Sequence, residues 1–134
     1  MPEAPTAPQG TTGLAPNVAG ALSYLLMPIT GILFFVLEKE DRFVRFHAAQ
    51  SIGVGIAFFA VNVVLMVLGS VLAVIPILGW LVGLALTMVV GLGGFCLWLY
   101  LMYRAYQGDE WEVPLVGPQV RRYLAGGTAV MPRR

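Results

Sequence analysis

Few side chains in this 134-residue sequence are of a type that could do chemistry, and the single histidine, His47, comes first among them. His47 precedes Ser51 by one helical turn, a spacing at which an imidazole can activate a hydroxyl nucleophile. It could also supply one ligand to a metal ion or a tetrapyrrole. A protein zinc site usually needs three or four ligands, and a catalytic serine also needs an acid and an oxyanion donor. Because no such partners accompany His47, the sequence predicts a hydrogen-bonded histidine at the membrane boundary.

The other reactive side chains also argue against a catalytic or metal site. Asp109, Glu110 and Glu112 flank Trp111 on a predicted surface segment, where acidic side chains are usually solvated. Cys96 is the only cysteine and lies within an apolar run, as a packing residue would. The sequence has no paired carboxylates within an apolar run, no zinc motif and no nucleophile elbow. We therefore expect a protein that is not an enzyme, with no catalytic residue, no metal site and no cofactor.

Three long runs without a charged residue dominate the chain, at residues 18–37, 51–74 and 78–103. Each reaches or exceeds the ~20 residues with which a helix crosses ~30 Å of hydrocarbon. With 58% hydrophobic and 11% charged residues and a mean hydropathy of +0.81, the chain has too little polar surface for a soluble fold. The net charge of +1 argues against a nucleic-acid partner. The predicted fold is an all-α integral membrane protein with three transmembrane helices.

The basic residues give this arrangement a direction across the membrane. All eight lie between Lys39 and Arg45 or from Arg104 onward, and basic loops stay on the cytoplasmic side. We therefore expect the N-terminus and an outer turn at residues 75–77 to lie outside, and the C-terminus to lie inside. Residues 1–17 hold four prolines and too little apolar bulk to fold alone, so they are predicted to be a flexible Pro-rich tail. Because they lack the basic start of a signal peptide, the first run is expected to stay in the mature protein. Residues 104–134 are predicted to be a cytoplasmic tail.

Residues 38–50 are predicted to form an amphipathic helix on the cytoplasmic boundary of the membrane. Asp41 can cap its start, and Glu38 and Asp41 each precede an arginine by four residues, the order that favours helical ion pairs. One face of this helix is expected to meet lipid headgroups or a partner protein. The predicted contact face consists of Arg42, Phe43, Arg45, Phe46 and His47.

Small and polar residues mark the expected contacts between helices. Four small residues recur every fourth position in the third run, two more lie one turn apart in the second, and an amide lies near the middle of the second. Small residues let helices approach closely, and a buried amide needs a hydrogen-bond partner. The sequence leaves open whether these contacts form within one chain or between chains. The predicted helix-packing interface consists of Gly79, Gly83, Thr87, Gly91, Ser51, Gly55 and Asn62.

Three segments resemble a known family: NVAGALSYLL in the first run, EKEDRFVRFHAAQS after it, and AYQGDEWEVPLVG after the third run. They are similar to small bacterial membrane proteins of undetermined function that are grouped with the Tic-twenty-like proteins. The plastid relatives of that family belong to the inner-envelope protein import machinery. The resemblance covers residues 17–123. It implies a multi-pass protein of the bacterial cytoplasmic membrane and, through the plastid relatives, a link to protein translocation.

Two functions follow from these observations. We expect an accessory or structural subunit, or an assembly factor, that packs against a larger membrane complex through its small-residue positions. The alternative is a pore or protein-translocation component that acts as a homo-oligomer, with Asn62 lining a shared lumen. Spans that conduct ions usually carry an ionisable residue, and these runs carry none. For both functions the expected partners are membrane lipids, other membrane-protein subunits and further copies of this chain.

Overall fold

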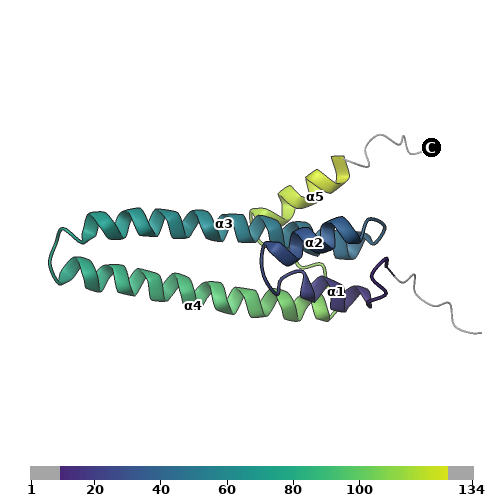
Figure 1. Ribbon diagram of the computed structural model, residues 1–134, viewed down its shortest axis with the longest axis horizontal. Coiled ribbons are helices and arrows are strands. Elements are labelled where there is room, and N and C mark those ends of the chain that lie inside the picture. Colours follow the sequence, from purple (N-terminus) through teal and green to yellow (C-terminus); the bar gives the residue numbers. More distant parts are fainter. Residues whose placement is uncertain (1–9, 127–134) are drawn as a thin grey trace, which may run out of the picture.

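The computed structural model describes residues 10–126, and these residues form five helices joined by turns and loops. The two longest helices run antiparallel as a hairpin, and the three shorter ones gather around one end of it (Figure 1). The described residues contain no strand, so the prediction of an all-α fold is confirmed. The helices are α1 (Pro16–Leu22), α2 (Ile29–Leu37), α3 (Arg42–Leu72), α4 (Leu78–Tyr106) and α5 (Val116–Gly126).

Helix α3 combines two elements that were predicted as separate. The expected boundary helix at 38–50 and the expected span at 51–74 are parts of one helix of 31 residues, about 46 Å long. Asp41 caps its start, because its carboxylate accepts hydrogen bonds from the backbone N–H groups of Phe43 (2.9 Å) and Val44 (3.2 Å). No proline lies between residues 42 and 72, so nothing interrupts the backbone hydrogen bonds after Gln50.

Helices α3 and α4 are the two described helices that are long and apolar enough to cross a membrane. At 31 and 29 residues, both exceed the ~20 residues that the hydrocarbon requires. Residues 46–103 carry no Asp, Glu, Lys or Arg, and within them residues 55–72 and 78–97 each match that thickness. We call residues 55–97 the outer hairpin, and we call residues 10–54 and 98–126 the head.

The first apolar run does not form a single transmembrane helix. Residues 18–37 are divided between α1 and α2, whose 7 and 9 residues extend only about 10–14 Å each. Pro28 prevents a continuous helix because it has no N–H group to donate and its ring clashes with the preceding turn. The hydroxyl of Thr30 stabilises the break by donating to the carbonyl oxygen of Ser23 (2.9 Å) and accepting from the N–H of Leu26 (3.1 Å). The structure thus offers two candidate spans where three were predicted.

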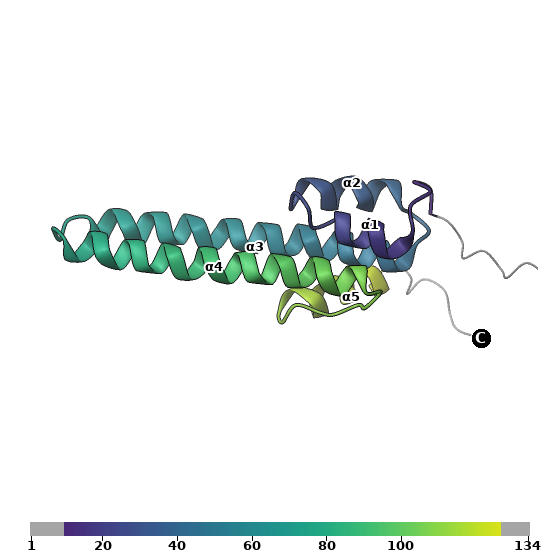
Figure 2. The same ribbon diagram turned by 90° about the horizontal axis from the view of Figure 1, so that it is seen from below.

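The beginning and the end of the described chain lie at the same end of the hairpin (Figures 1 and 2). The backbone N–H groups of Thr11 and Thr12 donate to the carboxylate of Glu38, each at 2.9 Å. A membrane-crossing helix over residues 18–37 would hold these groups ~30 Å apart. Residues 10–17, predicted as part of a flexible tail, form a turn and the start of α1. Residues 1–9 and 127–134, which hold the rest of the predicted tails, lie outside the described residues.

The buried core is confined to the head. In the outer hairpin Gly79 is the only buried residue, and most of its large apolar side chains are exposed. An apolar surface of this kind fits lipid or other membrane helices. Two clusters of apolar residues form the core, the first holding Ala21, Tyr24, Val54, Leu101, Ala105 and Val113, and the second holding Ala19, Phe34, Val44 and Ala48.

This arrangement predicts the labelling of single cysteines in intact cells. With Cys96 replaced by alanine, cysteines at Thr11 and Gly126 should lie on the same side of the membrane, and a cysteine at Val74 in the outer turn should lie on the opposite side. An impermeant thiol reagent should therefore label only Val74→Cys, since the basic residues of the head predict that it lies in the cytoplasm. Labelling of Thr11→Cys together with Val74→Cys, but not of Gly126→Cys, would restore the three-span arrangement.

Candidate functional site

A cluster of buried polar side chains lies at the centre of the head, where the chain after α1, helix α3 and the segment after α4 meet. Tyr24, Gln50 and Ser51 are 0% exposed, and His47 is 1% exposed. Buried polar groups are costly unless they form hydrogen bonds, so their partners determine what this cluster can do.

Three of these side chains form a hydrogen-bond chain with a fixed direction. The Nε2 amide of Gln50 donates to the hydroxyl of Tyr24 (2.9 Å), and this hydroxyl lies 2.9 Å from Nδ1 of His47. Nε2 of His47 lies 3.0 Å from the carbonyl oxygen of Asp109. Because a carbonyl can only accept, we assign the imidazole proton to Nε2, and Nδ1 then accepts from Tyr24. The histidine is therefore neutral in this arrangement.

The surroundings of these hydrogen-bonded side chains favour the neutral forms of His47 and Tyr24. His47 lies in the head, outside the outer hairpin, and burial lowers its pKa although the nearby Asp109 acts in the opposite direction. Burial likewise raises the pKa of the Tyr24 hydroxyl, against the smaller effect of the hydrogen bond from Gln50.

Gln50 connects α3 to the segment that leads to α5. Besides Tyr24, its Nε2 amide donates to the carbonyl oxygen of Trp111 (3.0 Å), and its Oε1 atom accepts from the N–H of Val113 (3.0 Å). Both amide protons and the amide oxygen are thus used. One side chain on α3 holds two backbone groups that have no helix or strand to satisfy them.

Two further hydrogen bonds fix the turn between α1 and α2. The hydroxyl of Ser51 donates to the carbonyl oxygen of Ser23 (2.6 Å), and the indole Nε1 of Trp98 donates to the carbonyl oxygen of Tyr24 (2.6 Å). Helices α3 and α4 therefore both bind the place where the first apolar run is broken. We call the side chains Tyr24, His47, Gln50, Ser51 and Trp98 the polar lock.

The polar lock does not support the chemical roles considered for its members. Both ring nitrogens of His47 are hydrogen-bonded, and the hydroxyl of Ser51 points to Ser23 rather than to the imidazole. Across residues 10–126, no three His, Cys, Asp or Glu side chains gather as metal ligands would. The arrangement suits a lock that holds the two short helices and the segment before α5 on the hairpin.

The predicted contact face of α3 lies partly inside the head. Phe46 and His47 are 2% and 1% exposed, because α1, α2 and α5 pack around the first turns of α3. The expectation that these two rings meet headgroups or a partner is therefore wrong, and it failed because residues 18–37 were taken for a membrane span. The rest of the predicted face is exposed or half-buried and consists of Arg42, Phe43 and Arg45.

Glu38 forms a second buried polar site that the sequence did not reveal. Its carboxylate accepts hydrogen bonds from the N–H groups of Thr11 and Thr12 and from the hydroxyl of Thr12. Burial by itself would raise the pKa of this carboxyl, but the three hydrogen bonds outweigh it and the pKa is lowered. Two glycines flank this pair of threonines, and Gly13 has φ of 71°, a turn signal from which the contact could have been suspected.

The acidic segment after α4 is paired with arginines rather than only solvated. Arg121 of α5 forms ion pairs with Glu110 (3.1 Å) and Glu112, and Arg104 of α4 pairs with Asp109. These side chains are a third to a half exposed, so each pair contributes little to stability. The two pairs of Arg121 orient α5 against the segment that precedes it.

The predicted helix-packing interface falls into two groups, and the first is used within the chain. A Cβ atom added at Gly79 would lie 1.8 Å from the carbonyl oxygen of Leu72, and one added at Gly55 would lie 3.0 Å from the side chain of Pro28. Ser51 belongs to the polar lock. These three positions let the outer turn close and let the turn before α2 approach α3.

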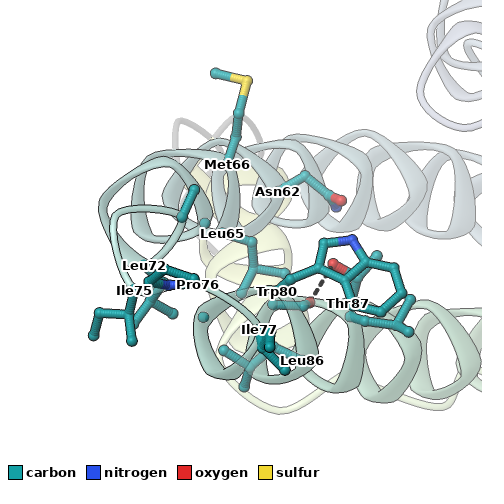
Figure 3. Close-up of a pocket in the computed structure, with 15 residues that line it drawn as sticks. Asn62, Leu65, Met66, Leu72, Ile75, Pro76, Ile77, Trp80, Leu86 and Thr87 are labelled. Carbon is teal, nitrogen blue, oxygen red and sulfur yellow. Dashed lines mark hydrogen bonds between the residues drawn. The ribbon is translucent and has the colours of Figure 1, made fainter.

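The second group lies along or near a groove that residues 10–126 do not fill. A Cβ atom at Gly83 or Gly91 would meet no atom within 4 Å. Gly83, Asn62 and Thr87 line an apolar groove of about 600 Å³ between the outer parts of α3 and α4 (Figure 3). The Nδ2 amide of Asn62 donates to the carbonyl oxygen of Phe58 (2.8 Å) in its own helix, and Thr87 donates to that of Gly83 (2.9 Å). Neither polar side chain has the partner on another helix that was predicted for Asn62.

The sequence of this chain matches a known protein family and several named relatives. Residues 11–120 match the model of the MamF/MmsF family, described as the magnetosome magnetite crystal formation protein family. A UPF0132 membrane protein of Methanocaldococcus jannaschii is 46% identical over 111 residues, which cover 83% of this chain and 90% of that protein. One of Archaeoglobus fulgidus is 43% identical over 110 residues, covering 82% and 96%. No solved structure matches the chain.

These matches correct the resemblance drawn from the sequence. The family match covers nearly the whole described chain, and neither it nor the curated relatives support membership in the Tic-twenty-like family. The link to protein translocation is lost with that resemblance. The relatives are named membrane proteins, in agreement with the two apolar helices. They come from archaea, so the bacterial cytoplasmic membrane stays a prediction.

Proposed function

We propose, from the premise that this chain belongs to the magnetosome magnetite crystal formation protein family, that it is a non-catalytic membrane subunit whose outer hairpin packs against another membrane helix. The head would act as a rigid base that holds the hairpin in place, and the hairpin would supply the contact. The protein would then serve a larger membrane assembly through packing rather than through chemistry.

The open groove between α3 and α4 is the observation that carries this proposal. Gly83 lines this groove and Gly91 lies two helical turns further along α4, and no side chain of residues 10–126 uses the space beside either glycine. In lipid, small residues allow close helix packing, and an amide such as Asn62 gains about 1 kcal/mol from a partner on another helix. A groove with both features suits a second membrane helix better than it suits lipid tails alone.

The description of the family names magnetosome magnetite crystal formation. In that setting this chain would have a packing role in the membrane. We assign no iron-binding step to it, because no three His, Cys, Asp or Glu side chains of residues 10–126 gather as metal ligands would, and most acidic side chains of the head have partners. Glu110 and Glu112 bind Arg121, Asp109 binds Arg104, and Glu38 binds backbone groups.

A bulky side chain in the groove provides the test. Gly83→Leu should leave the fold intact, since the space beside Gly83 is open, but should displace a helix packed there. We expect at least a tenfold drop in the partner that co-purifies in mild detergent through a C-terminal tag, measured by native mass and protein identification. Ala85→Leu is the matched control, because Ala85 is exposed on α4 and does not line the groove.

The same purification distinguishes the other possibilities. A wild-type protein that migrates alone near its chain mass of 14.5 kDa would refute the proposal. An assembly made only of this chain, disrupted by Gly83→Leu and able to pass ions into liposomes, would favour the homo-oligomeric pore instead.

A further inference from the structure

A second groove lies on the surface of the head, where α2, α3 and α5 meet. It has a volume of about 620 Å³, and almost all of its lining is apolar. Helix α5 leaves α3 at an angle (Figure 1), so Val120 and Tyr123 form one wall while Phe35 of α2 forms the other. Ile52 and Ile56 of α3 form part of the floor.

The floor of this groove leads from the level of the hydrocarbon to a charged residue. Arg45, Ala49, Ile52 and Ile56 follow one another at helical spacing, so they lie on the same face of α3. Ile56 belongs to the outer hairpin, where the bilayer begins, and Arg45 lies about 16 Å further into the head. Arg45 does not line the groove itself, but its guanidinium lies over the ring of Phe35, which does, so a cation lies directly beside the groove.

No carboxylate within residues 10–126 forms an ion pair with Arg45. Its guanidinium lies 4.3 Å from the centre of the Phe35 ring, and its Nη1 atom donates to the carbonyl oxygen of Phe35 (3.4 Å). Asp41, expected to pair with it, caps α3 instead, and none of the ion pairs found in residues 10–126 includes Arg45. Four of its five N–H donors are left for an anion.

We propose that this groove binds an anionic phospholipid, with one acyl chain along Ile52 and Ile56 and the phosphate at Arg45. An acyl chain suits an apolar groove that is continuous with the bilayer, and a guanidinium suits a phosphate because it can donate two parallel hydrogen bonds. The positive charge of Arg45 favours an anionic lipid over a neutral amphiphile. The inference is independent of the function proposed for the outer hairpin, because it concerns a different face and a different ligand.

Native mass spectrometry of the detergent-purified protein tests this site, with phosphatidylglycerol and phosphatidylcholine of equal chain length as probes. We expect one phosphatidylglycerol to be retained per chain, in preference to phosphatidylcholine. Arg45→Gln should lower this retention roughly fivefold, the contribution of one basic residue near an anionic headgroup. Arg45→Lys should restore most of it. Arg42→Gln should leave it unchanged, since none of the hydrogen bonds, ion pairs and ring contacts found in residues 10–126 joins Arg42 to a groove residue, whereas Arg45 contacts Phe35.

A second pair of variants tests the apolar part without touching a charge. Ala57→Trp should fill the groove and reduce phosphatidylglycerol retention, whereas Ala60→Trp, at an exposed position that does not line it, should not. Equal retention of the two lipids, or no effect of Arg45→Gln and Ala57→Trp, would refute the lipid site. A change in oligomeric mass with Ala57→Trp, at constant lipid retention, would show that a second copy occupies the groove and would also refute it.

Discussion

Replacing Gln50 by alanine should lower the free energy of unfolding of the head by about 3–5 kcal/mol. Gln50 is completely buried and holds the Tyr24 hydroxyl, the carbonyl oxygen of Trp111 and the N–H of Val113. Its removal would leave two backbone groups without partners in a closed space, and each such group costs about 1–3 kcal/mol. The truncation also leaves a cavity at the junction of α3 with the segment that leads to α5.

The Gln50→Ala protein should lose structure first in the segment that Gln50 holds, before the whole protein unfolds. Hydrogen exchange of the detergent-solubilised protein should increase first at residues 109–126, because Gln50 attaches this segment to α3, while the outer hairpin keeps its protection. Thermal unfolding of Gln107→Ala should match that of the wild type, since Gln107 is exposed at the end of α4. A Gln50→Ala protein with unchanged unfolding and exchange would mean that the polar lock does not hold the head together.

The sequence allowed the two long helices to be predicted because their signals are local. Charge-free runs of the required length specify a membrane helix almost without reference to the rest of the chain. The cap at Asp41 was predictable for the same reason, since its partners are the next few backbone groups. Hydropathy alone, however, treated residues 18–37 as equivalent to the other runs, and it gave Pro28 too little weight.

The contacts of the head were not predictable because they join residues far apart in sequence. Glu38 binds residues 11 and 12, and Gln50 binds residues 111 and 113. Apart from the Thr12 hydroxyl, these partners are backbone groups, which carry no signature in the sequence. An amphipathic face built from His47 and Phe46 therefore looked like a membrane contact, although its polar atoms serve the interior of the head.

The three segments that carried the family resemblance are also the segments that build the polar lock. NVAGALSYLL contains Ser23 and Tyr24, EKEDRFVRFHAAQS contains His47 and Gln50, and AYQGDEWEVPLVG contains the loop that they bind, including Trp111. The three distinctive segments of this sequence thus contact one another inside the head. The resemblance pointed to the wrong family, but the residues on which it rested are structurally linked.

The small-residue positions of α4 call for a final pair of substitutions, Gly79→Ala and Gly83→Ala. A methyl group at Gly79 would collide with the carbonyl oxygen of Leu72, a backbone atom that can move only if the outer turn opens. We expect this change to lower the free energy of unfolding by about 2–3 kcal/mol. At Gly83 the same methyl group meets open space, so alanine should be neutral or stabilise the helix by up to about 1 kcal/mol.

Unfolding of the monomeric protein in mixed micelles, with hydrogen exchange at residues 73–77, would measure both effects. Equal destabilisation by the two variants would mean that α3 and α4 pack along their whole length and that the groove closes within the chain. The expected difference would assign Gly79 to the outer turn and leave Gly83 free for another helix. Two residues of one sequence pattern would then have separate roles, because the α3–α4 turn closes beside only the first of them.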